Sequence, residues 1–163
     1  MKVEKNKVVG IHYSISIKNN EIVYSTLGYD AEELVQGSFS IFPMVAKALE
    51  GHAIGDELEV TLMPSNAYGE RNNQLVYELK NELFNDVDEF EIESAIQIPG
   101  GMEARVLKKN PNTILVDANH PLAGEQLHYK IKIISIRAAT EDEIKWGRTE
   151  TEIKACSGEP GCC

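Results

Sequence analysis

Cysteine is missing from most of this 163-residue chain: the three that it has, Cys156, Cys162 and Cys163, all stand in the last eight positions. A disulfide framework needs cysteines distributed through the fold, so this placement excludes a disulfide-rich protein. A catalytic thiol is also disfavoured, because a cysteine nucleophile needs a pocket and a base fixed beside it.

Basic residues and long apolar runs are scarce as well. The chain has 16 Lys and Arg against 26 Asp and Glu, a formal net charge of −10. Nucleic acids and anionic membrane surfaces are bound through clustered basic side chains, so we expect neither as a partner. No apolar run approaches the roughly 18 residues of a membrane span, and residues 1–7 lack the apolar core of a signal peptide. We therefore expect a cytoplasmic protein, and a monomer.

The common catalytic and metal-binding motifs are absent too. The four histidines, His12, His52, His120 and His128, stand singly, without the spacing of paired metal ligands. There is no GxSxG nucleophile motif and no phosphate-binding loop. The sequence thus offers no motif for hydrolysis, phosphate transfer or metal catalysis.

What is present indicates antiparallel strands around one short helix. Apolar and polar residues alternate over 9–17, which predicts a half-buried strand, and residues 21–24 return as its hairpin partner. Residues 43–50 predict a short helix, with proline in its first turn and glycine just after its end. Alternation resumes at 57–62 and at 127–133. The pattern predicts an α+β fold.

The middle of the chain differs from both ends. Between residues 82 and 93, acidic residues interleave with apolar ones, and strands are expected at 102–107 and 113–116 around a turn. We interpret this stretch as a small β-rich unit inserted in a larger one. After it, Thr140 and Glu143 form a capping box that opens a short helix.

One reaction needs no acid, base, nucleophile or metal: rotation about a prolyl peptide bond, whose uncatalysed barrier is about 18–20 kcal/mol. An apolar, aromatic-lined pocket can keep water from the carbonyl and hold the twisted amide. Tyr13, Phe42, Tyr68 and Tyr129 stand on separate predicted elements. Taken alone, these four fit either such a pocket or an ordinary core.

Four motifs make the sequence resemble the SlyD-like branch of the FKBP-type peptidyl-prolyl isomerases, over residues 1–147. They are ALEGHAIGD at 48–56, AYG at 67–69, VDANHPLAG at 116–124 and ATEDEI at 139–144. Their order and spacing match the pattern of that family throughout.

The resemblance implies two domains. An FKBP-like antiparallel half-barrel sheet around the short helix would comprise residues 1–70 and 120–147, and a chaperone domain, residues 71–119, would be inserted in its flap. Residues 148–163 would form a flexible cysteine-containing tail. The implied activity is prolyl isomerisation without a required cofactor, and the implied partners are unfolded or proline-containing polypeptides.

The resemblance also implies the site residues. Tyr68 would donate its hydroxyl to the substrate carbonyl, Ile41 would offer its backbone N–H, and Val45 would form the pocket floor. The whole implied isomerase pocket is Tyr13, Ile41, Phe42, Val45, Tyr68, Leu122 and Tyr129. Substrate chains would further contact Tyr24, Leu34, Leu83, Phe84, Val87, Phe90 and Ile92. About half of the apolar residues of the insert are expected in its own small core.

Four positions depart from the family pattern. Tyr24 stands where an acidic residue is usual, Glu32 where an apolar residue is usual, Met44 where glycine is usual, and Tyr129 where phenylalanine is usual. Glu32 is expected to place a charge at the pocket rim. These departures, with the small Val45 floor, leave open the alternative of a chaperone, or holdase, with a weakened isomerase site.

The C-terminal cysteines leave a third alternative. Relatives of this type often end in a long His- and Cys-rich segment that binds nickel, whereas this chain keeps only Cys156, Cys162 and Cys163 there. Thiolates prefer soft or borderline metals, so nickel, zinc or copper could bind, and the chain could act as a metallochaperone.

Overall fold

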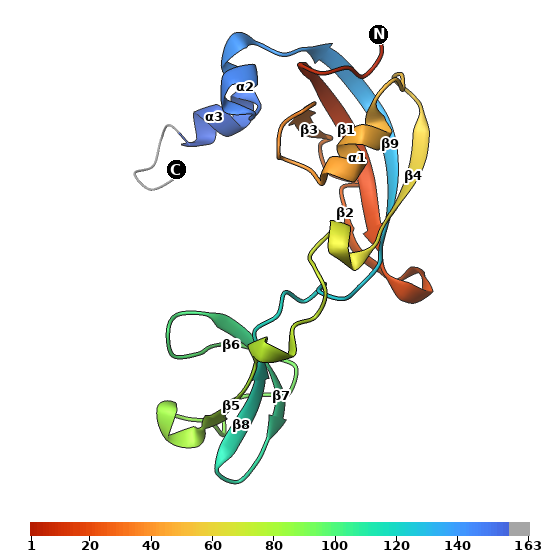
Figure 1. Cartoon of the computed structure of the whole chain (residues 1–163). Coiled ribbons are helices and arrows are strands. Elements are labelled where there is room, and N and C mark those ends of the chain that lie inside the picture. The colour runs from red at the N-terminus through yellow and green to blue at the C-terminus, as the bar shows by residue number, and fades with distance from the viewer. Residues whose placement is uncertain (157–163) are drawn as a thin grey trace. The chain divides into compact units, whose positions relative to one another are not determined.

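The computed structural model describes residues 1–156, and its elements fall into two compact units (Figure 1). The first unit contains residues 1–67 and the chain from residue 125 on; the second contains residues 68–124. The insert boundaries predicted from sequence, 71 and 119, lie within the second unit. Among residues 1–156, none of the helices has the length and apolar character that a transmembrane span requires.

The first unit is built on an antiparallel five-stranded sheet. Its strands are β1 (Lys7–Ser16), β2 (Ile22–Ser25), β3 (Glu32–Val35), β4 (Glu57–Leu62) and β9 (Leu127–Ala138). The long strand β9 lies between β1 and β4, while β2 and β3 pair with successive parts of the other edge of β1. The predicted hairpin and the three alternating segments are therefore confirmed.

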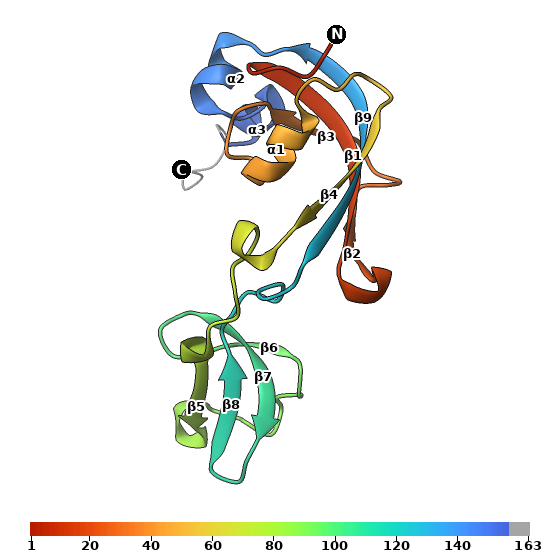
Figure 2. The same cartoon turned by 45° about the vertical axis from the view of Figure 1, so that its right-hand side comes forward.

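Helix α1 (Pro43–Leu49) lies across one face of this sheet (Figure 2). Proline occupies the first turn, where its missing N–H costs no hydrogen bond. Val45, Ala46 and Leu49 form the buried face of the helix. The buried side chain of Gln36 donates through Nε2 to the carbonyl of Ala46 at 2.6 Å, which ties the helix to the end of β3.

Two further helices follow the sheet. α2 (Glu141–Trp146) begins with the predicted capping box and ends at Gly147 in the left-handed conformation. α3 (Glu150–Cys156) lies where the sequence predicts a flexible segment. Its first N–H, that of Glu150, donates to the carboxylate of Glu143 at 2.9 Å. This hydrogen bond to the preceding helix helps to order α3, and the polar composition of the segment gives no sign of it.

The second unit contains a four-stranded antiparallel sheet in the order β5-β8-β7-β6. The strands are β5 (Val76–Lys80), β6 (Ala95–Gln97), β7 (Glu103–Lys109) and β8 (Thr113–Asp117). The predicted strands at 102–107 and 113–116 are confirmed, whereas β5 and β6 were not predicted. Single turns of 3-10 helix lie at Asn73–Leu75 and Asn81–Leu83 in this unit, and at Lys18–Asn20 and Pro64–Asn66 in the first unit. Together the two units confirm the α+β fold with a β-rich insert.

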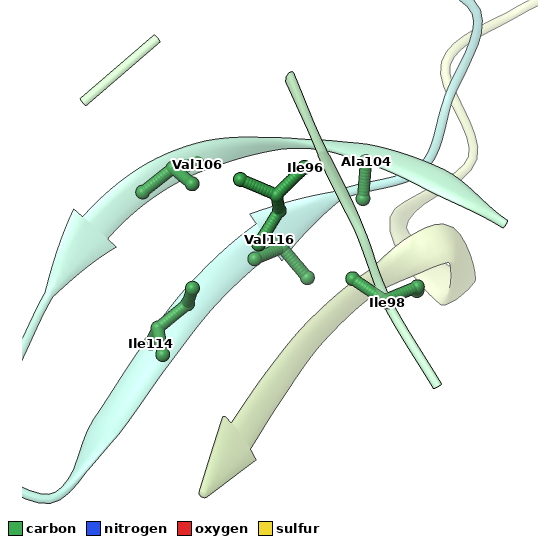
Figure 3. Packing of buried hydrophobic residues seen from close by; sticks show 6 residues of the cluster. All are labelled: Ile96, Ile98, Ala104, Val106, Ile114 and Val116. Carbon is green, nitrogen blue, oxygen red and sulfur yellow. The ribbon is translucent and has the colours of Figure 1, made fainter. Parts of the chain in front are cut away.

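The second unit has a hydrophobic core of its own (Figure 3). Its buried members are Ile96, Ile98, Ala104, Val106, Ile114 and Val116. They come from β7, β8 and the segment that includes β6, and Figure 3 shows their side chains gathered together. A private core of this kind allows the insert to hold its structure separately from the first unit.

A polar network closes the base of the second unit, where the chain enters and leaves it. The buried carboxylate of Asp117 pairs with Arg71 at 2.7 Å and accepts the Nδ2 of Asn119 at 2.6 Å. Asn119 in turn exchanges two hydrogen bonds with the backbone of Asn72, at 2.8 and 2.9 Å. Burial acts to raise the pKa of Asp117, but these hydrogen bonds and the Arg71 charge outweigh it and keep the pKa below its usual value.

Candidate active site

An aromatic cluster lies on one face of the sheet of the first unit. Tyr13 stacks on Tyr129, with ring centroids 5.8 Å apart, and lies 5.5 Å from Tyr24. Phe42 meets Tyr129 edge-on at 6.5 Å. Three of the four aromatic residues singled out from the sequence thus come together, and Tyr24 joins them.

Strand register explains why these rings share a face. Tyr24 on β2 and Tyr129 on β9 both lie opposite Ile15 of β1, one on each side. Side chains two residues apart on a strand point to the same face, so Tyr13 stands beside this row. Glu32 of β3 lies opposite Ile11, which belongs to the same alternating series. The register therefore directs all of these side chains toward the face that carries the cluster.

The backbone of Tyr13 is fixed by Thr26, a buried residue just after β2. The N–H of Tyr13 donates to Thr26 Oγ1 at 2.9 Å, and the N–H of Thr26 donates to the carbonyl of Tyr13 at 2.9 Å. Phe42 is fixed in a different way, because its carbonyl accepts the N–H groups of Val45 and Ala46 at the start of α1. Hydrogen bonds therefore hold the backbone of both aromatic residues in place.

The Tyr13 hydroxyl donates to Glu32 Oε2 at 2.9 Å. Burial, followed by this hydrogen bond and the negative charge of Glu32, raises the pKa of Tyr13 well above its ordinary value. The phenol therefore stays protonated at any physiological pH. The exposed carboxylate of Glu32 is thus a formal charge in direct contact with the cluster.

The other predicted pocket residues differ in burial. Val45 is fully buried, Tyr129 is 3% exposed, and Ile41 and Phe42 are half-buried. Leu34, predicted to contact substrate, is only 4% exposed and packs in the core. It is inaccessible in this structure because β3 turns that side chain inward.

Tyr68 and Leu122 belong to the second unit, so their place in the pocket stays a prediction. The structure shows a local arrangement around them that the sequence reading missed. The ring of Tyr68 stacks on that of His120, with centroids 3.8 Å apart and planes 7° from parallel. The N–H of Leu122 donates to His120 Nδ1 at 3.1 Å. His120 lies in the VDANHPLAG motif, but a single histidine without metal-ligand spacing gives no signal of this stacking in the sequence.

The apolar residues predicted to bind chains divide into two groups. Phe84, Val87 and Phe90 are partly buried against the core of the second unit, and the two phenylalanine rings meet edge-on at 5.4 Å. Leu83 is 55% exposed and Ile92 is 58% exposed. The expectation that part of this set forms the core of the insert is confirmed, and two residues are left on its surface.

Thr26 and the partner of Tyr13 were also missed by sequence reasoning. Glu32 was noticed as a charge near the pocket, but nothing in the sequence indicates that it would accept the Tyr13 hydroxyl. Thr26 belongs to no recognised motif, and its hydrogen bonds to the Tyr13 backbone arise only because the chain after β2 passes beside Tyr13.

No group of three His, Cys, Asp or Glu side chains that could hold a metal ion occurs among the described residues. Cys162 and Cys163 lie outside the described residues, and the side chain of Cys156 is not described either. Binding of nickel, zinc or copper at these cysteines stays a prediction.

Comparison with known proteins agrees with this architecture. The family model for FKBP-type peptidyl-prolyl cis-trans isomerase matches residues 1–113, more than half of the chain. The isomerase SlyD of Vibrio cholerae is 31% identical over 174 residues, covering 100% of this chain and 86% of its own. SlyD of Pasteurella multocida is 32% identical, covering 97% and 81%, and SlyD of Escherichia coli K12 is 29% identical, covering 90% and 76%. The chain belongs to the FKBP-type peptidyl-prolyl cis-trans isomerases, in the SlyD-like group.

Proposed function

We propose that the aromatic cluster on Tyr13, Phe42 and Tyr129 binds the proline of a polypeptide substrate, and that the second unit captures unfolded chains for it. The cluster carries the proposal, because aromatic rings from β1, from β9 and from the residue before α1 come together on one face of the sheet. Such a site suits a reaction that consists only of rotation about a bond.

The cluster would act by exchanging water for apolar contacts. In the planar amide, resonance places negative charge on the oxygen, and water stabilises that charge. Rings of Phe42 and Tyr129 around the proline would remove this water and favour the twisted amide, which has lost the resonance. By resemblance, the Tyr68 hydroxyl and the Ile41 N–H would orient the substrate carbonyls. The Tyr13 hydroxyl is already engaged by Glu32, so it serves to position its own ring.

The second unit would supply the chain-binding surface. Leu83 and Ile92 are exposed apolar side chains within an acidic segment, and the acids would keep such a surface soluble. β5 and β6 are the outer strands of the sheet, and extended peptide can pair with an outer strand through its backbone. Acidic surroundings also favour clients with exposed basic and apolar residues.

Glu32 favours a second candidate function, a chaperone whose isomerase site is weakened. A carboxylate in hydrogen-bond contact with the cluster draws water toward a surface that works by excluding it. The isomerisation rate of a short prolyl peptide separates the two functions, since only the first requires turnover of such a peptide.

Phe42→Ala is expected to lower kcat/KM on a short proline-containing peptide about tenfold, because a ring contact of the bound proline is lost, about 1.4 kcal/mol. The rate is measured by exchange NMR between the cis and trans forms. Phe39→Ala is the matched control, since Phe39 is 99% exposed and lies outside the cluster. Equal loss in both variants, or none in Phe42→Ala, would contradict the assignment.

The double variant Leu83→Ser, Ile92→Ser is expected to weaken suppression of aggregation severalfold, because it removes two exposed apolar contacts. Light scattering of an aggregating client gives the effect, and isomerisation of a short peptide should stay unchanged. Ile54→Ser is the control, being 54% exposed on the first unit. If the control weakens chaperoning as much, the binding surface is not on the second unit.

A further inference from the structure

A groove of about 500 Å³ opens beside the aromatic cluster of the first unit. It is lined by Tyr24, Ser25, Thr26, Tyr29, Asp30 and Glu32. Three of these residues connect it to the proposed proline site. The ring of Tyr24 packs 5.5 Å from that of Tyr13, Glu32 accepts the Tyr13 hydroxyl, and Thr26 exchanges hydrogen bonds with the Tyr13 backbone. A substrate whose proline lies on the cluster would place a neighbouring side chain here.

The charge of this groove is negative and uncompensated. Asp30 and Glu32 are both exposed, and no ion pair within residues 1–156 includes either of them. The single bond from Tyr13 leaves Glu32 with further acceptor capacity, because an ionised carboxylate can accept several hydrogen bonds. A positively charged group entering the groove would find two carboxylates open to it.

The aromatic faces of the groove point to the same class of ligand. Tyr24, on β2, is 48% exposed, and Tyr29, in the segment that follows β2, is 80% exposed. Ring faces carry negative potential and attract ammonium and guanidinium groups. A neutral apolar side chain could also contact the rings, but it would leave the two carboxylates without a cationic partner.

We propose that this groove binds the side chain of a lysine or arginine next to the substrate proline, so that the enzyme prefers cationic sequences. The inference rests on the proposed function, because it places the proline on the cluster of Tyr13 and Phe42. Glu32 then acts as a specificity residue for the reaction.

The test uses two sets of three peptides, one that varies the residue before proline and one that varies the residue after it. Within each set the varied residue is lysine, its uncharged analogue norleucine, or glutamate. Affinity is measured by fluorescence anisotropy and isomerisation by exchange NMR. The full chain is expected to bind the lysine peptide about tenfold more tightly than the norleucine peptide, and the glutamate peptide least. The preference should shrink as salt is added.

Glu32→Gln is the informative variant, since its amide oxygen can still accept the Tyr13 hydroxyl while the charge is gone. It should lose most of the preference for lysine, and Asp30→Asn with Glu32→Gln should lose all of it. Glu50→Gln, an exposed acid outside the groove, is the control for overall charge and should keep the preference.

Two results would overturn the inference: equal or absent binding of all three peptides in both sets by the full chain, or a lysine preference that survives the double variant. Charge-dependent binding without isomerisation of any peptide would support the groove and count against the isomerase site. The two proposals can therefore fail separately.

Discussion

Replacing residues 71–119 by a short loop is expected to lower catalysis of proline-limited refolding about 100-fold, while turnover of a short prolyl peptide is largely kept. A binding unit tethered to a catalytic unit raises the effective concentration of the captured chain, and gains of this order follow without new contacts. A short peptide gains nothing from capture, because it does not span both units.

The structure makes this replacement practicable. The segments that would be joined are already linked by a hydrogen bond from the N–H of Gly124 to the carbonyl of Gly69 at 2.8 Å, so a few residues can bridge them. The sheet of the first unit is formed entirely by strands outside the removed range.

Refolding of a slow-folding, proline-limited protein would be followed by fluorescence with both forms of the enzyme. Retention of full acceleration by the shortened chain would show that the second unit does not deliver substrate. No acceleration by the full chain, with aggregation still suppressed, would favour the holdase with a weakened site.

Local patterns predicted the first unit better than the second. β1, β4 and β9 have one face on a core, so their apolar residues alternate, and α1 is marked by Pro43 and Gly51. β6 has only three residues and is held by pairing with β7. Such a strand is too short to show a period, so its existence depends on contacts that local sequence does not encode.

The candidate site was predictable in its residue types but not in its contacts. The resemblance singled out Tyr13 and Phe42, but the bond from Tyr13 to Glu32 joins residues 19 positions apart through the register of β3 on β1. The sequence also does not show that Leu83 is exposed while Phe84 is partly buried. This stretch has no regular alternation of apolar residues, so burial there depends on how the chain turns.

The second large effect is expected at Glu143, which joins the end of the sheet to both C-terminal helices. Its fully buried carboxylate accepts both terminal nitrogens of Arg137, at 2.7 and 2.8 Å, and the N–H groups of Thr140 and Glu150, each at 2.9 Å. Arg137 also pairs with Glu33 of β3 at 3.0 Å. Glu143→Ala removes the carboxylate that accepts the N–H groups of Thr140 and Glu150 and leaves Arg137 with only one of its two acidic partners, so we expect it to lower the free energy of unfolding by about 3 kcal/mol.

The pH dependence of protein stability distinguishes the contribution of the Glu143 charge from that of side-chain packing. Hydrogen bonds from Arg137, opposed by burial and aided by the two backbone N–H groups, lower the pKa of Glu143 to about 2. A lowered pKa in the folded state stabilises the fold at every pH above the unfolded value, near 4.3, and this contribution is lost as pH falls toward 2. The stability advantage of the native protein over Glu143→Gln should therefore shrink between pH 5 and about pH 2.

Urea unfolding followed through Trp146, the single tryptophan and a residue of α2, reports directly on this region. Glu141→Gln is the matched control, since Glu141 is an exposed acid in the first turn of the same helix. If the difference in free energy of unfolding between the native protein and Glu143→Gln stays constant across this pH range, the charge of the carboxylate does not contribute and only its packing does. A shrinking difference would show that α2 and α3 are fastened to the sheet by one buried charge.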